Sequence, residues 1–129
     1  MPQIFVFSLM VGIGGFFGSL ARFSLSHIAQ RLTITWPAGT FAANILGCFF
    51  IGIIMALAAR GDSLSPEMKI LLATGFCGGF TTLSSFVYET TEMIRSSEYV
   101  HAVFYVSGTF FISIVSFYLG TIFLKILIK

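Results

Sequence analysis

GFCGGFTTLSSF, residues 75–86, places glycines and hydroxyls inside a run that is otherwise suited to a membrane-spanning helix. The surrounding residues 70–88 contain no Asp, Glu, Lys or Arg. The pair Gly78–Gly79 and the two threonines that follow it shortly after make a poor helix interior. Main chain at bilayer depth leaves the helix only where it is buried in protein or lines a water-filled cavity. We therefore expect a spanning helix that is broken in mid-membrane near residues 75–82, where exposed main-chain groups can form an ion site.

Three further long stretches lack charged side chains: residues 1–21, 32–59 and 99–124. Crossing about 30 Å of hydrocarbon takes roughly 20 helical residues, and these runs do not alternate as the strands of a β-barrel do. Of all residues 57% are hydrophobic and 9% are charged, whereas soluble domains have about 25% charged residues. The sequence predicts an all-α membrane protein with one transmembrane domain, 1–129, and four helices near residues 4–26, 37–59, 66–95 and 99–127.

Charge and side-chain chemistry exclude two classes of function. The net charge of +2 comes with scattered basic residues, so we expect no nucleic-acid partner. His27 and His101 are single and close to helix ends, and Ser84 and Ser85 lack the sequence context of a nucleophilic serine. Glu89 is expected at the interface or partly buried, with no second carboxylate at mid-membrane depth. We predict that the protein is not an enzyme.

Small residues recur at the spacing that lets helices approach closely. Gly14 and Gly18 are four residues apart, and Gly39, Ala43 and Gly47 form a second such row. Rows of this kind pack helices in membranes. Because four helices are little protein for a path across a bilayer, we expect these rows to serve both packing within the chain and a homo-oligomer.

The basic residues give the chain almost no preferred orientation. Membrane topology follows the asymmetry of Lys and Arg between the two sides. In the four-helix arrangement, four basic residues fall on the side of the chain ends and three on the other, namely Arg60, Lys69, Lys125 and Lys129 against Arg22, Arg31 and Arg95. We expect the chain to insert in both orientations and to pair antiparallel.

Several polar side chains lie within or at the ends of the predicted spans. Arg22 ends the first apolar run, where it either reaches the interface or attracts anions. Asn44 lies well inside the second span, and from its position alone structural and pore-lining roles are equally open. Tyr105, Thr109 and Ser113 follow one another at intervals of four residues, so they make one polar stripe on an otherwise apolar helix.

The stretch GTFAAN, residues 39–44, together with the glycine-rich motif 75–86, resembles the CrcB/Fluc family of fluoride channels. The likeness covers essentially the whole chain, including its length, its four spans and its near-balanced charge. It implies a passive channel that exports fluoride from the cytoplasm through two pores in an antiparallel, dual-topology homodimer. It also implies a multi-pass protein of the bacterial plasma (inner) membrane.

The resemblance implies a fluoride pathway made of hydrogen-bond donors and ring edges. Fluoride is strongly hydrated, so a selective pore must replace its water with N–H and O–H groups, and the positive edge of a phenyl ring can flank an anion. An arginine near the entrance would attract the ion. Carried over to this sequence, the expected pathway residues are Arg22, Asn44, Leu83, Ser84, Phe86, Tyr105, Thr109 and Ser113.

The resemblance also implies a structural sodium ion at the centre of the dimer, held by the main-chain carbonyls of Gly78 and Thr81 from both subunits. One position departs from the family pattern, which has two phenylalanines three residues apart. Phe86 matches the second, but Leu83 occupies the first and offers no ring edge. Phe80 lies three residues earlier, and the sequence does not show that it compensates.

Two other functions fit a small four-helix membrane protein. A multidrug exporter that exchanges protons for cationic drugs needs a carboxylate in its first helix, and residues 1–21 contain none. A purely structural subunit would permit no ion leak at all. Fluoride flux measured against chloride flux separates the channel from both alternatives.

Overall fold

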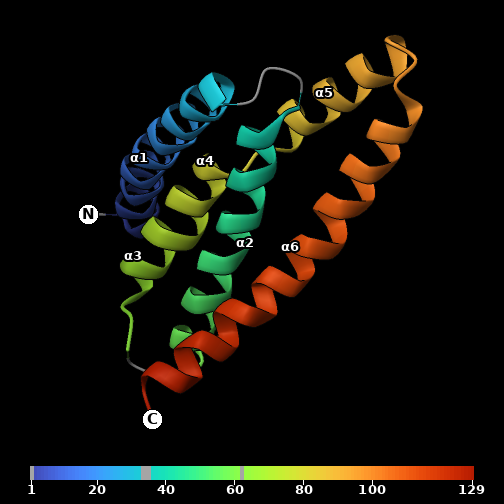
Figure 1. Cartoon of the computed structure of the whole chain (residues 1–129). Coiled ribbons are helices and arrows are strands. Elements are labelled where there is room, and N and C mark those ends of the chain that lie inside the picture. Colours follow the sequence, from blue (N-terminus) through green and yellow to red (C-terminus); the bar gives the residue numbers. More distant parts are fainter. Residues whose placement is uncertain (1, 33–35, 62) are drawn as a thin grey trace.

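The computed structural model describes residues 2–32, 36–61 and 63–129, and in these residues all regular secondary structure is helical (Figure 1). The helices follow one another up and down along the chain, joined by short connections. In chain order they are α1 (Gln3–Leu32), α2 (Ala38–Ala58), α3 (Pro66–Lys69), a π-helical segment η1 (Ile70–Cys77), α4 (Gly78–Phe80), α5 (Leu83–Arg95) and α6 (Tyr99–Leu127).

Four helical stretches are long and apolar enough to cross a membrane, which confirms the all-α, four-span prediction. They are α1, α2, the region Pro66–Arg95 that contains α3, η1, α4 and α5, and α6, with lengths of 30, 21, 30 and 29 residues. The helix α1 runs on to Leu32, beyond the expected end near residue 26. Its last turns are polar, so the end of the apolar run marks an expected membrane boundary and not the end of the helix. Residues 33–35 and 62, which belong to the expected connections, lie outside the described residues.

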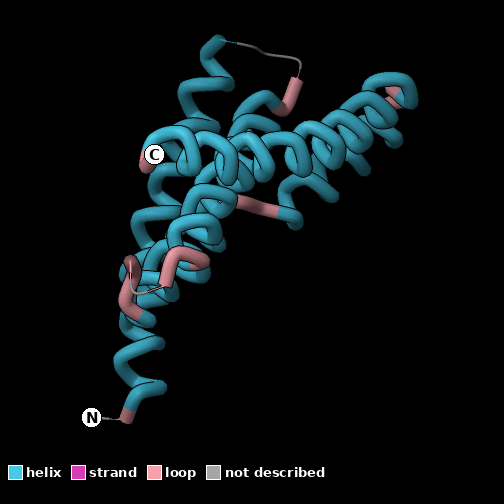
Figure 2. The backbone as a smooth tube through the Cα atoms, turned by 90° about the horizontal axis from the view of Figure 1, so that it is seen from below, coloured by secondary structure: helices cyan, strands magenta, loops and turns pink. Residues whose placement is uncertain are grey.

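The four spans pack as two pairs that cross each other. The helix α1 lies beside η1 and α4, and α2 lies beside α6 along much of its length (Figure 1). The helix α5 continues away from this pair and meets the beginning of α6 at the tight turn that joins them. A view turned by 90° shows the short non-helical piece between α4 and α5 inside the bundle (Figure 2).

Glycines let the paired helices touch through their main chains. A Cβ atom on Gly14 or Gly18 of α1 would overlap main-chain atoms of η1, and a Cβ on Gly52 of α2 or Gly120 of α6 would overlap the main chain of the opposing helix. Such contacts replace side-chain interlocking with close backbone packing. The row of Gly14 and Gly18 is thus used inside the chain and does not by itself indicate a second copy.

The glycine-rich stretch is helical up to Phe80, and the main chain becomes extended only at Thr81 and Thr82. Gly79 lies against α1, where an added Cβ would come within 2.6 Å of the Gly15 carbonyl oxygen. Close packing on α1 therefore explains Gly79, although a glycine at this place in the sequence is also typical of a helix break. The change of direction falls on the two threonines that follow.

The buried core of the single chain is small. A cluster of Phe86, Met93, Ala102 and Tyr105 joins α5 to α6, and Tyr105 is completely buried. Most other large apolar side chains are exposed along the four spans. An exterior of this kind fits lipid, or other protein within lipid, and not water.

Candidate functional site

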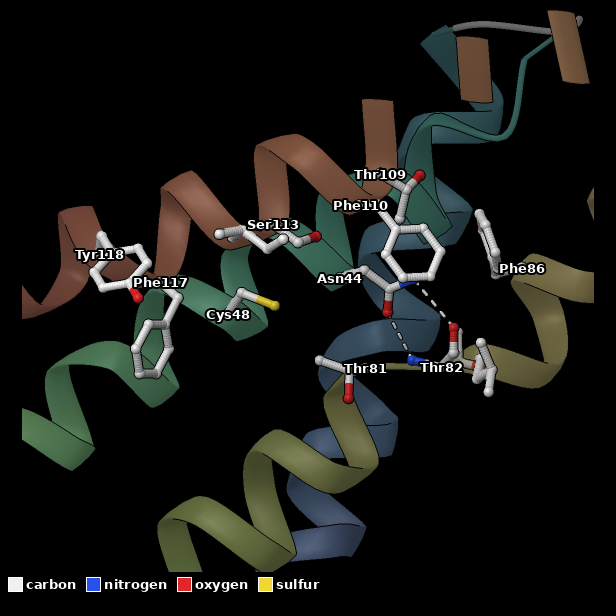
Figure 3. A pocket seen from close by; sticks show the side chains of 12 residues that line it. Asn44, Cys48, Thr81, Thr82, Phe86, Thr109, Phe110, Ser113, Phe117 and Tyr118 are labelled. Atoms are coloured by element: carbon white, nitrogen blue, oxygen red, sulfur yellow. Dashed lines mark hydrogen bonds between the residues drawn. The ribbon is translucent and has the colours of Figure 1, made fainter. Parts of the chain in front are cut away.

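A pocket of about 590 Å³ lies where α2, the α4–α5 connection and α6 meet (Figure 3). It is open on one side, and its wall mixes apolar side chains with an amide and several hydroxyls. The residues that line it are Asn44, Cys48, Thr81, Thr82, Leu83, Phe86, Thr109, Phe110, Ser113, Ile114, Phe117 and Tyr118.

The floor of the pocket is the extended connection between α4 and α5. Thr81 has φ −88° and ψ 158°, and Thr82 has φ −151° and ψ 123°. Thr82 is also the N-cap of α5, because its hydroxyl oxygen accepts a hydrogen bond from the Ser85 N–H at 3.2 Å. Gly47 of α2 gives the connection room, since a Cβ there would overlap the Thr81 side chain.

The Asn44 side chain fastens this connection to α2. Its Oδ1 accepts a hydrogen bond from the Thr82 N–H at 2.8 Å, and its Nδ2 donates to the Thr82 carbonyl at 3.1 Å. Figure 3 shows both bonds as dashed lines beneath the pocket. The amide thus satisfies two main-chain groups that the helix interruption releases, and it keeps a second N–H that points to no partner among the described residues.

The interruption also leaves carbonyls without their usual helical donors, among them those of Gly78 and Thr81. In an uninterrupted helix the Thr82 N–H would bond to the Gly78 carbonyl and the Ser85 N–H to the Thr81 carbonyl. Here the first donates to Asn44 and the second to the Thr82 hydroxyl. The Gly79 carbonyl between them accepts a hydrogen bond from Nε of Arg22 at 3.1 Å.

The three residues of the predicted polar stripe on α6 have different surroundings. The Tyr105 hydroxyl is buried and donates to Oε2 of Glu89 at 2.6 Å. The Thr109 hydroxyl donates to the carbonyl of Tyr105, also at 2.6 Å. Among the described residues Ser113 has no hydrogen-bond partner, so its hydroxyl is available to a ligand in the pocket.

Glu89, in the middle of α5, joins three helices. One carboxylate oxygen accepts a hydrogen bond from Thr40 of α2 at 2.7 Å, and the other accepts from Tyr105 of α6. Two hydroxyl donors compensate for part of the cost of removing a carboxylate from water. This hydrogen-bonded group includes Tyr105 of the buried cluster, and none of its three residues lines the pocket.

The pocket brings together five of the eight residues expected in the pathway. Asn44, Leu83, Phe86, Thr109 and Ser113 all line it. The other three lie elsewhere in the single chain. Arg22 bonds to the Gly79 carbonyl, Tyr105 is directed to Glu89, and Ser84 is exposed beside the Thr82 hydroxyl at 3.2 Å.

Sequence reasoning did not identify the partners of these residues. The pairing of Asn44 with Thr82 and of Glu89 with Tyr105 joins positions far apart in the chain, and no local spacing marks it. Thr40 was recognisable only as a hydroxyl one helical turn from Asn44. Phe110, which also lines the pocket, looks in the sequence like any other apolar residue of a lipid-facing helix.

Comparison with known proteins gives a consistent result over almost the whole chain. Residues 9–121 match the family described as CrcB-like protein, Camphor Resistance (CrcB). A protein of Chlorobium phaeobacteroides named fluoride-specific ion channel FluC is 43% identical over 126 residues, covering 98% of this chain and 97% of that protein. A protein of the same name from Chlorobaculum tepidum is 43% identical over 118 residues, covering 92% and 94%. Fluoride-specific ion channel FluC 1 of Methanosarcina acetivorans is 41% identical over 114 residues, covering 88% and 87%.

Proposed function

Because this chain belongs to the CrcB-like family, we propose that it is a passive, fluoride-selective ion channel of the bacterial inner membrane. It is a multi-pass membrane protein, and its relatives are named as ion channels and not as enzymes. The observation that carries the proposal is the pocket beside the interrupted third span. There an amide N–H and a hydroxyl without a partner face the same space as phenyl rings.

These groups suit a small, strongly hydrated anion. The unused N–H of Asn44 and the hydroxyl of Ser113 can each donate a hydrogen bond in place of water. Phenyl rings add the partial positive charge of their edges, and they need no hydrogen-bond partner of their own. Thr109 can join them only by turning its hydroxyl away from the Tyr105 carbonyl.

The direction of flow follows from the membrane potential. A negative-inside potential lowers the free energy of a monovalent anion outside the cell relative to inside by about 2.3 kcal/mol for each 100 mV. Fluoride enters as neutral HF from acid surroundings and ionises inside at the higher pH. A passive pore therefore exports it without a pump.

The proposed assembly is an antiparallel homodimer with two pores. The pocket of the single chain is open, and Leu83 at its edge is 70% exposed. A pore in lipid must be closed on all sides, and a second copy would supply the missing wall. The near-equal division of basic residues, four against three, supports opposite orientations of the two copies.

The proposed sodium ion at the dimer centre would be held by the carbonyls of Gly78 and Thr81. Both carbonyls have lost their usual helical donors to Asn44 and Thr82. An added Cβ at Gly78 would meet nothing within 4 Å in the single chain, so this surface has room for a partner. Oxygen ligands of this kind suit a hard monovalent cation.

Fluoride release from proteoliposomes tests the proposed function directly. Vesicles loaded with potassium fluoride and given valinomycin should release fluoride to an electrode, whereas vesicles loaded with chloride should retain their anion. Equal release of both ions, or of neither, would contradict the proposal. A reporter fused to the C-terminus should be found on both faces of the membrane if the dimer is antiparallel.

The alternative of a proton-coupled multidrug exporter has no support in the chain. The helix α1 (Gln3–Leu32) contains no Asp or Glu to exchange protons. Drug-dependent proton movement in the same vesicles would be the result that favours it.

A further inference from the structure

The pocket contains a phenyl ring that the sequence did not mark as functional. Leu83, at the start of α5, lines the pocket with an alkyl side chain that offers no ring edge. Phe80 does not replace the missing ring, because it is 5% exposed and packs on Phe76 and Phe50 outside the pocket. Two further phenyl rings line the pocket, those of Phe110 and Phe117. Phe110 pairs with Phe86, whereas Phe117 lies near Tyr118 at the other end of the pocket (Figure 3).

Phe110 is better placed than Phe86 to face an ion. The Phe86 side chain is 7% exposed, with its ring 5.1 Å from that of Tyr105, whereas Phe110 is 59% exposed in the single chain. The centroids of the Phe86 and Phe110 rings lie 6.4 Å apart at an interplanar angle of 73°, which is an edge-to-face pair. Aromatic pairs prefer this relative orientation of their rings.

Of the paired rings on α5 and α6, that of Phe110 is the exposed one, and it lies beside the hydrogen-bond donors of the pocket. A phenyl edge carries partial positive charge and attracts an anion, whereas a leucine side chain has no comparable field. Phe110 follows Thr109 directly on α6 and shares the pocket with Ser113 and Asn44. An anion between these donors would therefore meet the ring of Phe110.

We infer that Phe110 is a further residue of the fluoride pathway, to which it supplies the ring edge that Leu83 lacks. The inference rests on the proposed fluoride conduction. It gives Phe110 of α6 the role that a ring at position 83 of α5 would otherwise have. A phenyl ring at either position should therefore be enough to contact the anion.

Single-channel recording in planar bilayers tests the inference with Phe110→Leu. The fluoride current should fall about three- to tenfold, the range expected for loss of one electrostatic ring interaction. Phe111→Leu is the matched control, because the neighbouring Phe111 is 71% exposed and does not line the pocket. Its current should equal that of the wild type. An unchanged current in Phe110→Leu would overturn the inference while leaving the proposed function intact.

A rescue variant separates an electrostatic role from a packing role. Adding Leu83→Phe to Phe110→Leu returns a ring to the pocket from the other helix, and the current should recover at least half of its loss. If both variants elute as folded protein and the double variant is no better than Phe110→Leu, the inference is wrong. A wild-type protein that conducts no fluoride would overturn the proposed function and this inference together.

Discussion

The amide of Asn44 binds both main-chain groups of Thr82, with hydrogen bonds of 2.8 Å from the N–H and 3.1 Å to the carbonyl. A carboxamide is one of the few side chains that can both accept a hydrogen bond from the N–H of a residue and donate one to its carbonyl. The same side chain faces the pocket. Asn44 therefore has a structural role at the helix interruption in addition to its expected role in the pathway.

Asn44→Asp should abolish fluoride flux. The carboxylate can still accept from the Thr82 N–H, but it cannot donate to the Thr82 carbonyl, and it places a negative charge where an anion must pass. The measurement is fluoride release from proteoliposomes. Cys48→Ala, one helical turn away and lining the same pocket, is the control and should retain flux. Normal flux in Asn44→Asp would exclude Asn44 from the pathway.

Tyr105→Phe should destabilise the protein without changing the shape of the side chain. It removes the donor that bonds to Glu89 at 2.6 Å, and hydrogen bonds to charged groups contribute about 1.5–3 kcal/mol. Denaturant titration in detergent measures the loss. Tyr118→Phe is the matched control, since that tyrosine is exposed and its hydroxyl has no partner among the described residues. Equal stability of the two variants would show that the Glu89 bond contributes nothing.

The helical fold was predictable from the sequence because a bilayer restricts the possible solutions. Long uncharged runs must form helices in lipid, so the charge gaps gave the four spans. The end of α1 was less predictable, since the polar turns up to Leu32 lie beyond any constraint from the bilayer. The sequence predicted a break near residues 75–82, and the extended residues Thr81 and Thr82 lie at the end of that range. The exact residues were not predictable, because Gly79 serves close packing on Gly15.

The chemistry of the site was predictable in part. Asn44, Thr109 and Ser113 stood out because polar groups are rare in such spans, and all three line the pocket. Their hydrogen-bond partners depend on how the helices cross, which residue spacing does not encode. Phe110 gave no signal at all, since one phenylalanine among sixteen is unremarkable in an apolar chain.

Gly52→Val should prevent correct folding of the α2–α6 pair. A Cβ at this position would overlap the main-chain carbonyl of Phe117, and backbone cannot move aside as a side chain can. Overpacking typically costs about 1–3 kcal/mol, and a backbone clash lies at the upper end. Size-exclusion chromatography should show aggregate. Gly12→Ala is the control, because a Cβ there meets nothing within 4 Å, and a monodisperse Gly52→Val protein would contradict the close approach.

Removing sodium should lower the thermal stability of the dimer if the carbonyls of Gly78 and Thr81 hold the proposed ion. A ligand that binds only the folded assembly stabilises it in proportion to the logarithm of its concentration. Melting temperatures in sodium chloride and in N-methylglucamine chloride of equal ionic strength make the comparison. The midpoint should rise with sodium concentration, and identical midpoints in both salts would speak against the site.

Phe86→Ile should reduce fluoride current more than Leu83→Phe does. Phe86 packs in the buried cluster with Tyr105, and its loss removes both a ring and the partner that orients Phe110. Leu83 is exposed at the pocket edge, so a phenylalanine there adds a ring without displacing core atoms. Single-channel currents of the two variants, each checked for a monodisperse dimer, decide the order. A larger loss in Leu83→Phe would mean that the pathway depends on the alkyl side chain at the edge of the pocket, and the role given to the rings would have to be abandoned.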